Sequence, residues 1–237
     1  MSTELYKDIV PFGAPIDGAT KTVTIGDWLW CPDVALSYLL GARILLDSAR
    51  DDDIDRIVLP ISYLQRHALE VGIKDAIDLA YEISFSRAWL GQLHVDLGAP
   101  PPTLRRASFD HGLSRLITEL DRALSSIGYD PAPPLLRAMA DELAETEQNK
   151  PDRWRYSKVR SQSRVGFEPS FSTPVAVPLA DIQSRLETVF TRHLWFRDQE
   201  HALGDEPTLI ETLGIESERL DQTLFPVLHH AGRADEI

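Results

Sequence analysis

The sequence has little that would cross-link the chain or anchor it in a membrane. Its 237 residues include one cysteine, so no disulfide can form within the chain, and we expect a cytoplasmic protein. No apolar run approaches the ~20 residues that a membrane-spanning helix needs, and the first residues lack the basic and then apolar profile of a secretory signal. We therefore expect neither a membrane protein nor a disulfide-rich secreted domain.

Positive charge is also scarce, since 24 Lys and Arg stand against 37 Asp and Glu and give a formal net charge of −13. This balance argues against broad, non-specific binding of nucleic acid, which depends on clustered cations. One local exception is DRWRYSKVRSQSR (residues 152–164), where arginines alternate with aromatic residues. Arg155 and Tyr156 are candidates for binding phosphates and stacked bases. The alternative is a solvated or ion-paired surface.

Several catalytic signatures are missing. Glycine is sparse and forms no phosphate-binding loop after a strand, and no nucleophile elbow is present. His229 and His230 together with His201 and Glu200 suggest a metal site, but they show no recognisable ligand spacing, and a solvated terminal pair of histidines is the better interpretation. We therefore predict no metal and no cofactor.

Apolar residues recur at helical spacing over most of the chain and predict a mostly α-helical fold. Helices are predicted at 33–50, at 54–81 or with a bend on to 96, and at 110–127, 131–148 and 179–201, with extended segments at 20–25 and 165–177. We divide the chain into an N-terminal extended segment (1–32), a helical bundle (33–202) and an acidic C-terminal tail or peripheral helix (203–237). The predicted core contains Ile57, Ile61, Leu64, Leu69, Ile73, Leu113, Leu116 and Leu120.

The helix predicted from residue 54 carries a narrow polar strip. At ~100° per residue, its polar side chains share a sector of about 100°, while apolar residues occupy much of the remaining circumference. Such a strip lines a cleft, meets a partner, or forms an internal ion-pair network. In the structural interpretation Glu70 pairs with Lys74 one turn later. In the functional one, Arg binds a phosphate and His titrates near neutral pH. The strip consists of Tyr63, Arg66, His67, Glu70, Lys74 and Tyr81.

Three segments together resemble HEPN-like helical proteins of prokaryotes. They are YLQRHALEVGIKDAI (63–77), DHGLSRLITEL (110–120) and DRWRYS (152–157), in the order that the family shows. The resemblance implies an antiparallel helical bundle that forms a homodimer. It also implies metal-independent RNA cleavage, which many catalytic members perform with an Arg followed, after four to six residues, by a His.

The spacing of Arg and His departs from this pattern in the best-matching helix. Arg66 and His67 are adjacent, so their side chains point ~100° apart. Arg106 and His111 enclose four residues and lie at a predicted helix N-terminus, which favours an anionic phosphate. Arg87 and His94 enclose six. Arg106 with His111 is the preferred pair, and the alternative for His111 is a solvated position in the first turn.

Two functions therefore remain open. The first is a metal-independent ribonuclease of a defence or toxin-antitoxin system, with Arg66, His67, Arg106 and His111 as catalytic candidates. The second is a non-catalytic dimerising scaffold or sensor subunit that binds a protein partner or a nucleotide. The resemblance implies an antitoxin, a larger defence complex or RNA as partners. Binding candidates common to both are Tyr63, Glu70, Lys74, Arg155 and Tyr156.

Overall fold

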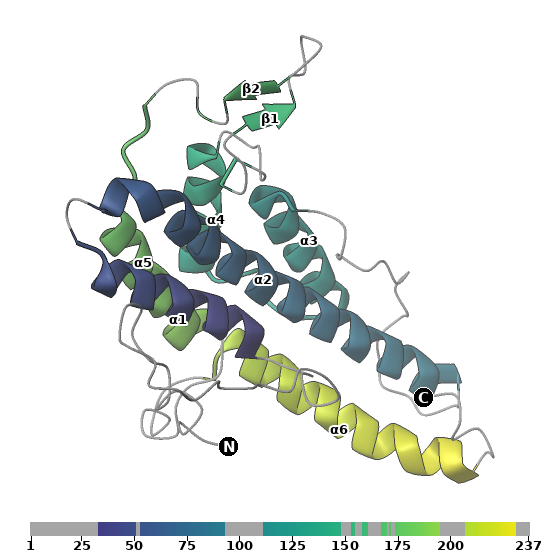
Figure 1. Ribbon diagram of the computed structural model, residues 1–237. Helices are drawn as coiled ribbons and strands as arrows, with labels where there is room; N and C mark the ends of the chain where they lie inside the picture. Colours follow the sequence, from purple (N-terminus) through teal and green to yellow (C-terminus); the bar gives the residue numbers. More distant parts are fainter. Residues whose placement is uncertain are drawn as a thin grey trace.

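The computed structural model describes residues 33–50, 53–92, 111–147, 153–154, 158–160, 167–169, 171, 174–194 and 207–230. Within these ranges the chain is mostly α-helical, which confirms the predicted class (Figure 1). The extended segment predicted within 1–32 lies outside the described residues. The elements are α1 (Asp33–Ser48), α2 (Ile54–Gln92), α3 (Leu113–Ser126), α4 (Pro134–Thr146), β1 (Lys158–Arg160), β2 (Phe167–Pro169), α5 (Leu179–Val189), the π-helical turn η3 (Phe190–Leu194) and α6 (Leu209–His230).

The long helix α2 organises the bundle. Its 39 residues correspond to a length of about 58 Å at 1.5 Å per residue. Helices α1, α3, α5 and α6 all contact it, and α4 contacts α3 and α5 (Figure 1). These neighbouring helices cover most of the circumference of α2, which agrees with its largely apolar sequence pattern.

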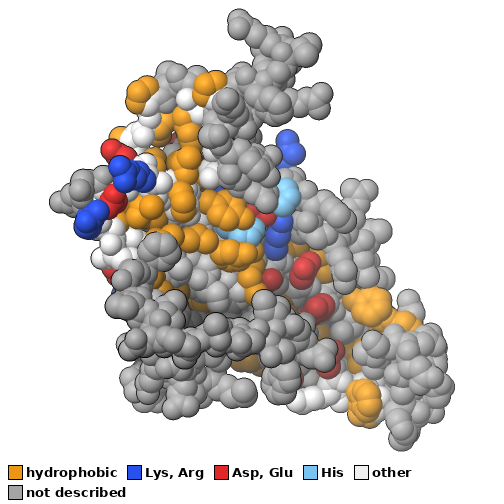
Figure 2. Space-filling view, viewed as in Figure 1, with side chains coloured by type: hydrophobic (Ala, Val, Ile, Leu, Met, Phe, Trp, Pro, Cys, Tyr) orange, Lys and Arg blue, Asp and Glu red, His pale blue; other side chains and the backbone are white. Residues whose placement is uncertain are grey.

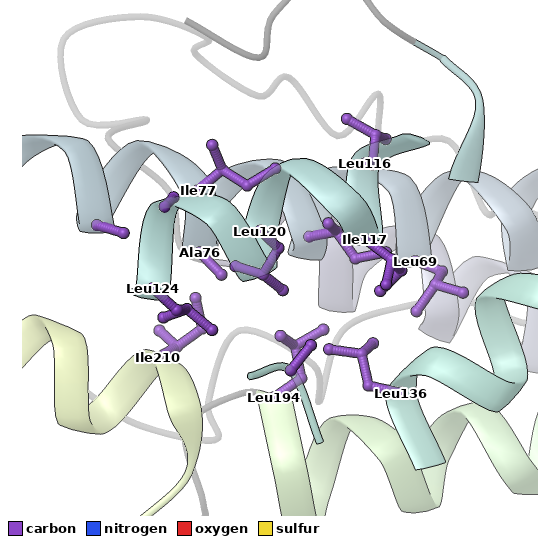
Figure 3. Close-up of a cluster of buried hydrophobic side chains, with 14 of the residues drawn as sticks. Leu69, Ala76, Ile77, Leu116, Ile117, Leu120, Leu124, Leu136, Leu194 and Ile210 are labelled. Carbon is purple, nitrogen blue, oxygen red and sulfur yellow. The ribbon is translucent and has the colours of Figure 1, made fainter. Parts of the chain in front are cut away.

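The core forms where the apolar stripes of these helices meet (Figure 3). On α3, buried residues recur at spacings of three and four, which places them on the face toward α2. Of the predicted core residues, Ile57 and Leu64 are only partly buried, in a second cluster around Ile61. The others are buried as predicted: Ile61, Leu69, Ile73, Leu113, Leu116 and Leu120.

A glycine allows η3 to lie close against α2. A Cβ atom at Gly72 would lie 2.9 Å from Leu194 Cδ2 and 3.2 Å from Phe190 Cζ. Real Cβ atoms do not approach other atoms so closely without a shift of the neighbour. Gly72 therefore provides the space that the buried side chains of η3 fill.

The C-terminal region contributes to the core rather than lying outside it. Helix α6 buries Ile210, Leu213, Leu220 and Leu224 within the main hydrophobic cluster. The bundle thus extends past the boundary predicted at residue 202. Strands β1 and β2 pair antiparallel in a small hairpin, and β2 lies within the extended segment predicted at 165–177. None of the described helices is long and apolar enough to cross a membrane.

Candidate functional site

Helix α2 brings three charged residues of the predicted strip together on successive turns. Arg66, Glu70 and Lys74 are four residues apart, so they share one face of the helix. Lys74 Nζ donates a hydrogen bond of 2.7 Å to Glu70 Oε1, and Arg66 Nη1 donates to Glu70 Oε2. Glu70 is buried, so this carboxylate is an internal acceptor for two cationic side chains.

Arg66 also connects α2 to two other helices. Its Nε donates to Glu147 Oε2 at 2.9 Å, at the C-terminal end of α4. Its Nη2 donates to the backbone carbonyl of His111, just before α3. Arg66 is buried, and each of its three nitrogens donates to an acceptor within the protein. In this arrangement Arg66 positions other groups and does not meet a phosphate from solvent, which differs from the direct catalytic contact expected from the sequence.

His111 is the more accessible histidine of the cluster. Its side chain is 50% exposed, and its Nδ1 lies 2.7 Å from Glu70 Oε1. Because an ionised carboxylate only accepts hydrogen bonds, this contact assigns the proton of the neutral imidazole to Nδ1. The Nε2 atom of His111 is then unprotonated and able to accept a proton.

His67 lies between two tyrosines. Its ring stacks on Tyr63 with a centroid distance of 5.2 Å and an interplanar angle of 15°. Tyr38 of α1 contacts the same ring edge-on at 4.5 Å. His67 Nδ1 is 3.6 Å from Glu70 Oε2, which is too long for a hydrogen bond but close enough for attraction when the ring is protonated. Its side chain is 23% exposed, so His67 borders the cluster.

The electrostatics keep Glu70 ionised. Burial alone would raise the pKa of the Glu70 carboxyl. The contacts from His67 and Lys74 and the charge of Arg66 outweigh burial and hold this pKa well below its usual range. The carboxylate therefore stays negative at neutral pH and keeps its donors, including His111, in place.

Acidic residues follow the cluster along α2. Burial raises the pKa of the Asp75 carboxyl to about 7, and the charge of Asp78 adds to this effect. Further along, Arg122 Nη2 donates a hydrogen bond of 2.7 Å to the Tyr81 hydroxyl, which donates to Glu119 on α3. Tyr81 therefore belongs to a structural contact between α2 and α3.

The space-filling view shows histidine, basic and acidic side chains gathered on one face of the protein (Figure 2).

Most of the remaining sequence candidates cannot be compared with this cluster. Arg106, Arg155 and Tyr156 lie outside the described residues, as does His94. Arg87 donates to the carbonyl of Ile127 and to Glu216 on α6, so it links helices elsewhere. Within the part of the chain that the structure describes, no group of three or more His, Cys, Asp or Glu residues is arranged to hold a metal ion.

Two residues of the cluster were missed from the sequence. Glu147 ends α4, and Tyr38 lies in the middle of α1. Neither stands in the polar strip of α2, and both meet it only because the helices pack together. The proline at 151 predicts that the preceding helix ends shortly before it. An acidic residue near that end, Glu147, was the one signal available in the sequence.

Comparison with protein-family models, with curated proteins and with solved structures finds no match. The resemblance to HEPN-like proteins therefore depends on the three sequence segments alone.

Proposed function

We propose that the chain is a HEPN-like helical protein that cleaves RNA without a metal ion, with His111 as the general base. The observation that carries the proposal is the half-exposed imidazole of His111 on the buried carboxylate of Glu70. A carboxylate that accepts from Nδ1 fixes the tautomer and orients the ring, so that Nε2 carries the free lone pair. A free surface histidine lacks this support.

The reaction would proceed by internal attack. His111 Nε2 removes the proton from a ribose 2′-hydroxyl, the 2′-oxygen attacks the phosphorus, and the bond to the 5′-oxygen breaks. The products are a 2′,3′-cyclic phosphate and a 5′-hydroxyl, which receives a proton from a second acid. His67 is the candidate acid because it borders the same carboxylate.

Lys74 takes the place that the sequence suggests for arginine. Lys74 Nζ and His111 Nδ1 each lie 2.7 Å from the same oxygen, Glu70 Oε1. Lys74 therefore brings a positive charge close to the general base, where charge develops on the phosphate. Arg66 supports this pair from inside the bundle through Glu70 and the carbonyl of His111.

The second candidate is a non-catalytic dimerising scaffold or sensor subunit of a defence or toxin-antitoxin system. Two observations favour it: Arg66 is committed to internal acceptors, and the carboxylate of Asp78 lies one turn after Lys74 on α2. Negative charge there opposes the approach of an RNA backbone. In this interpretation the cluster fixes the helices, and the surface around His111 holds a partner.

The test is RNA cleavage by the purified protein in the presence of a chelator. His111→Ala should lower the rate by about 10²- to 10⁴-fold, as loss of a general base does. His193→Ala, on η3 and outside the Glu70 cluster, is the matched control and should cleave normally. The products should end in 2′,3′-cyclic phosphate.

Three results would contradict the ribonuclease proposal. They are full activity of the His111→Ala variant, cleavage that requires added magnesium, and no cleavage with or without a partner protein. The last result, together with a dimer in light scattering, would favour the scaffold.

A further inference from the structure

Helix α2 carries a partly exposed stripe that begins one turn after the Glu70 cluster. Asp78, Glu82, Phe85 and Trp89 follow one another at spacings of four, three and four residues, so they share one face of the helix. Glu82 is exposed, Phe85 is 42% exposed, and the other two side chains are half-buried. Figure 2 shows acidic and then hydrophobic side chains toward the C-terminal end of α2. These four residues form the acidic-aromatic stripe.

The helix that covers this face near the cluster does not reach the stripe. His67 lies on the same face of α2 and contacts Tyr38 of α1. Helix α1 begins at Asp33, five residues before Tyr38, which corresponds to about 7.5 Å. Asp78 lies eleven residues, or about 16 Å, beyond His67. Helix α1 therefore ends before the stripe begins.

The stripe has two chemically different halves. The Phe85 and Trp89 rings meet edge to face, with centroids 5.9 Å apart. Surface aromatic residues of this kind are typical of the centre of protein interfaces, where they contribute most of the binding energy. Toward the cluster, Asp78 and Glu82 carry negative charge on a chain whose formal net charge is −13. Arg122 on the flanking α3 already bonds to a carboxylate of its own helix, so its charge is balanced there.

We propose that the acidic-aromatic stripe docks a basic amphipathic helix of another protein. Apolar side chains of the partner pack on Phe85 and Trp89, and its Lys or Arg side chains lie against Asp78 and Glu82, about 10 Å away along α2. RNA or an anionic lipid surface would be repelled by the two carboxylates. The proposal goes beyond RNA cleavage and holds whether or not the chain cleaves RNA.

The test uses the full chain and two synthetic peptides of about 14 residues, or ~21 Å of helix. One peptide is an amphipathic helix of Leu and Lys, and the other has Glu in place of each Lys. Fluorescence anisotropy should show a Kd of about 1–100 μM for the Leu–Lys peptide, as for a small interface. The Leu–Glu peptide should bind at least about tenfold more weakly, because the carboxylates repel it.

Two substitutions on the stripe and two matched substitutions on α6 locate the binding surface. Phe85→Ser and Glu82→Lys should each weaken binding of the Leu–Lys peptide by at least about tenfold. Phe225→Ser and Glu218→Lys make the same changes at exposed positions of α6, where Phe225 is 56% exposed, and should leave the affinity unchanged.

Photo-crosslinking to the native chain keeps the test decisive if a variant does not fold, which circular dichroism checks. A photoreactive Leu–Lys peptide should attach to α2 between residues 78 and 89. Equal losses from the α2 and α6 variants would reduce the binding to attraction by net charge and overturn the proposal. No binding at millimolar peptide concentration, or crosslinks outside the stripe, would do the same. If Phe85→Ser instead lowers the mass of the native chain in light scattering, the stripe pairs with a second copy, which also overturns it.

Discussion

Glu70→Gln tests the central feature of this structure, the buried carboxylate that holds the helices. The substitution keeps the size of the side chain and removes its charge. In the native protein this carboxylate accepts from Arg66, Lys74 and His111. A neutral amide can accept through one atom only, so buried Arg66 loses one of its two carboxylate partners and keeps only Glu147.

The expected loss of stability is large because the network is buried. Both Arg66 and Glu70 have side chains that are 3% exposed, and breaking such a pair from one side costs about 3–5 kcal/mol. The matched control is Glu142→Gln, which removes the partner of Arg185 in a half-exposed pair. Pairs of that kind contribute about 0–1 kcal/mol. For a domain of this size each kcal/mol shifts the Tm by about 2–4 °C.

The assay is urea unfolding of both variants and the native chain across pH. In the folded state the pKa of Glu70 lies below the usual 4.5, so between these values the unfolded chain binds a proton that the folded chain does not. Stability from Glu70 is therefore complete above about pH 4.5 and is lost as the pH falls through the folded pKa. The difference between the native chain and Glu70→Gln should shrink in the same window.

The reasoning about burial would be refuted by a small effect. If Glu70→Gln costs no more than Glu142→Gln at neutral pH, the Glu70 carboxylate does not hold the helices together. A difference that stays constant down to pH 2 would likewise contradict the lowered pKa of Glu70.

Two further substitutions test packing and a second carboxyl group. Gly72→Ala should destabilise by about 1–2 kcal/mol in urea unfolding, because its Cβ would press on Leu194, whereas Gly41→Ala has ordinary space and should stabilise by about 0.5–1 kcal/mol; equal effects would contradict the close approach of η3. Burial and Asp78 raise the pKa of Asp75 to about 7, so the folded chain holds the extra proton and stability falls as the pH rises from the usual 3.8 to 7. Asp75→Asn should remove this slope and stabilise the chain at pH 8, and a flat native profile would contradict the shift.

The helices were predictable because their apolar periodicity reflects burial directly. Leu113, Leu116 and Leu120 repeat at helical spacing and all lie in the core. The role of α6 was not predictable, since Ile210 and Leu213 stand in an acidic region with scattered apolar residues. Only the apolar surface of α2 and its neighbours makes that stretch part of the bundle.

The polar strip was predictable as a set, but the burial of each member was not. A helical projection gives the direction of a side chain and says nothing of what covers it. Arg66 and His67 are adjacent in sequence, yet Glu147 and the start of α3 enclose Arg66, while His67 remains partly exposed. These covering groups are distant in the sequence, so only the packed structure separates a positioning residue from an accessible one.

The difference between a positioning residue and an accessible one also decides whether the Glu70 cluster is a functional site or a structural network. His111 is half exposed and bonds to the network through one ring nitrogen, so His111→Ala should cost no more than about 1 kcal/mol of stability. Loss of Glu70 removes the acceptor of three donors and should reduce stability and activity together. If His111→Ala abolishes cleavage and barely changes unfolding, His111 acts in the chemistry. If it destabilises the chain as much as Glu70→Gln does, the imidazole is one more internal donor, and the cluster serves the fold.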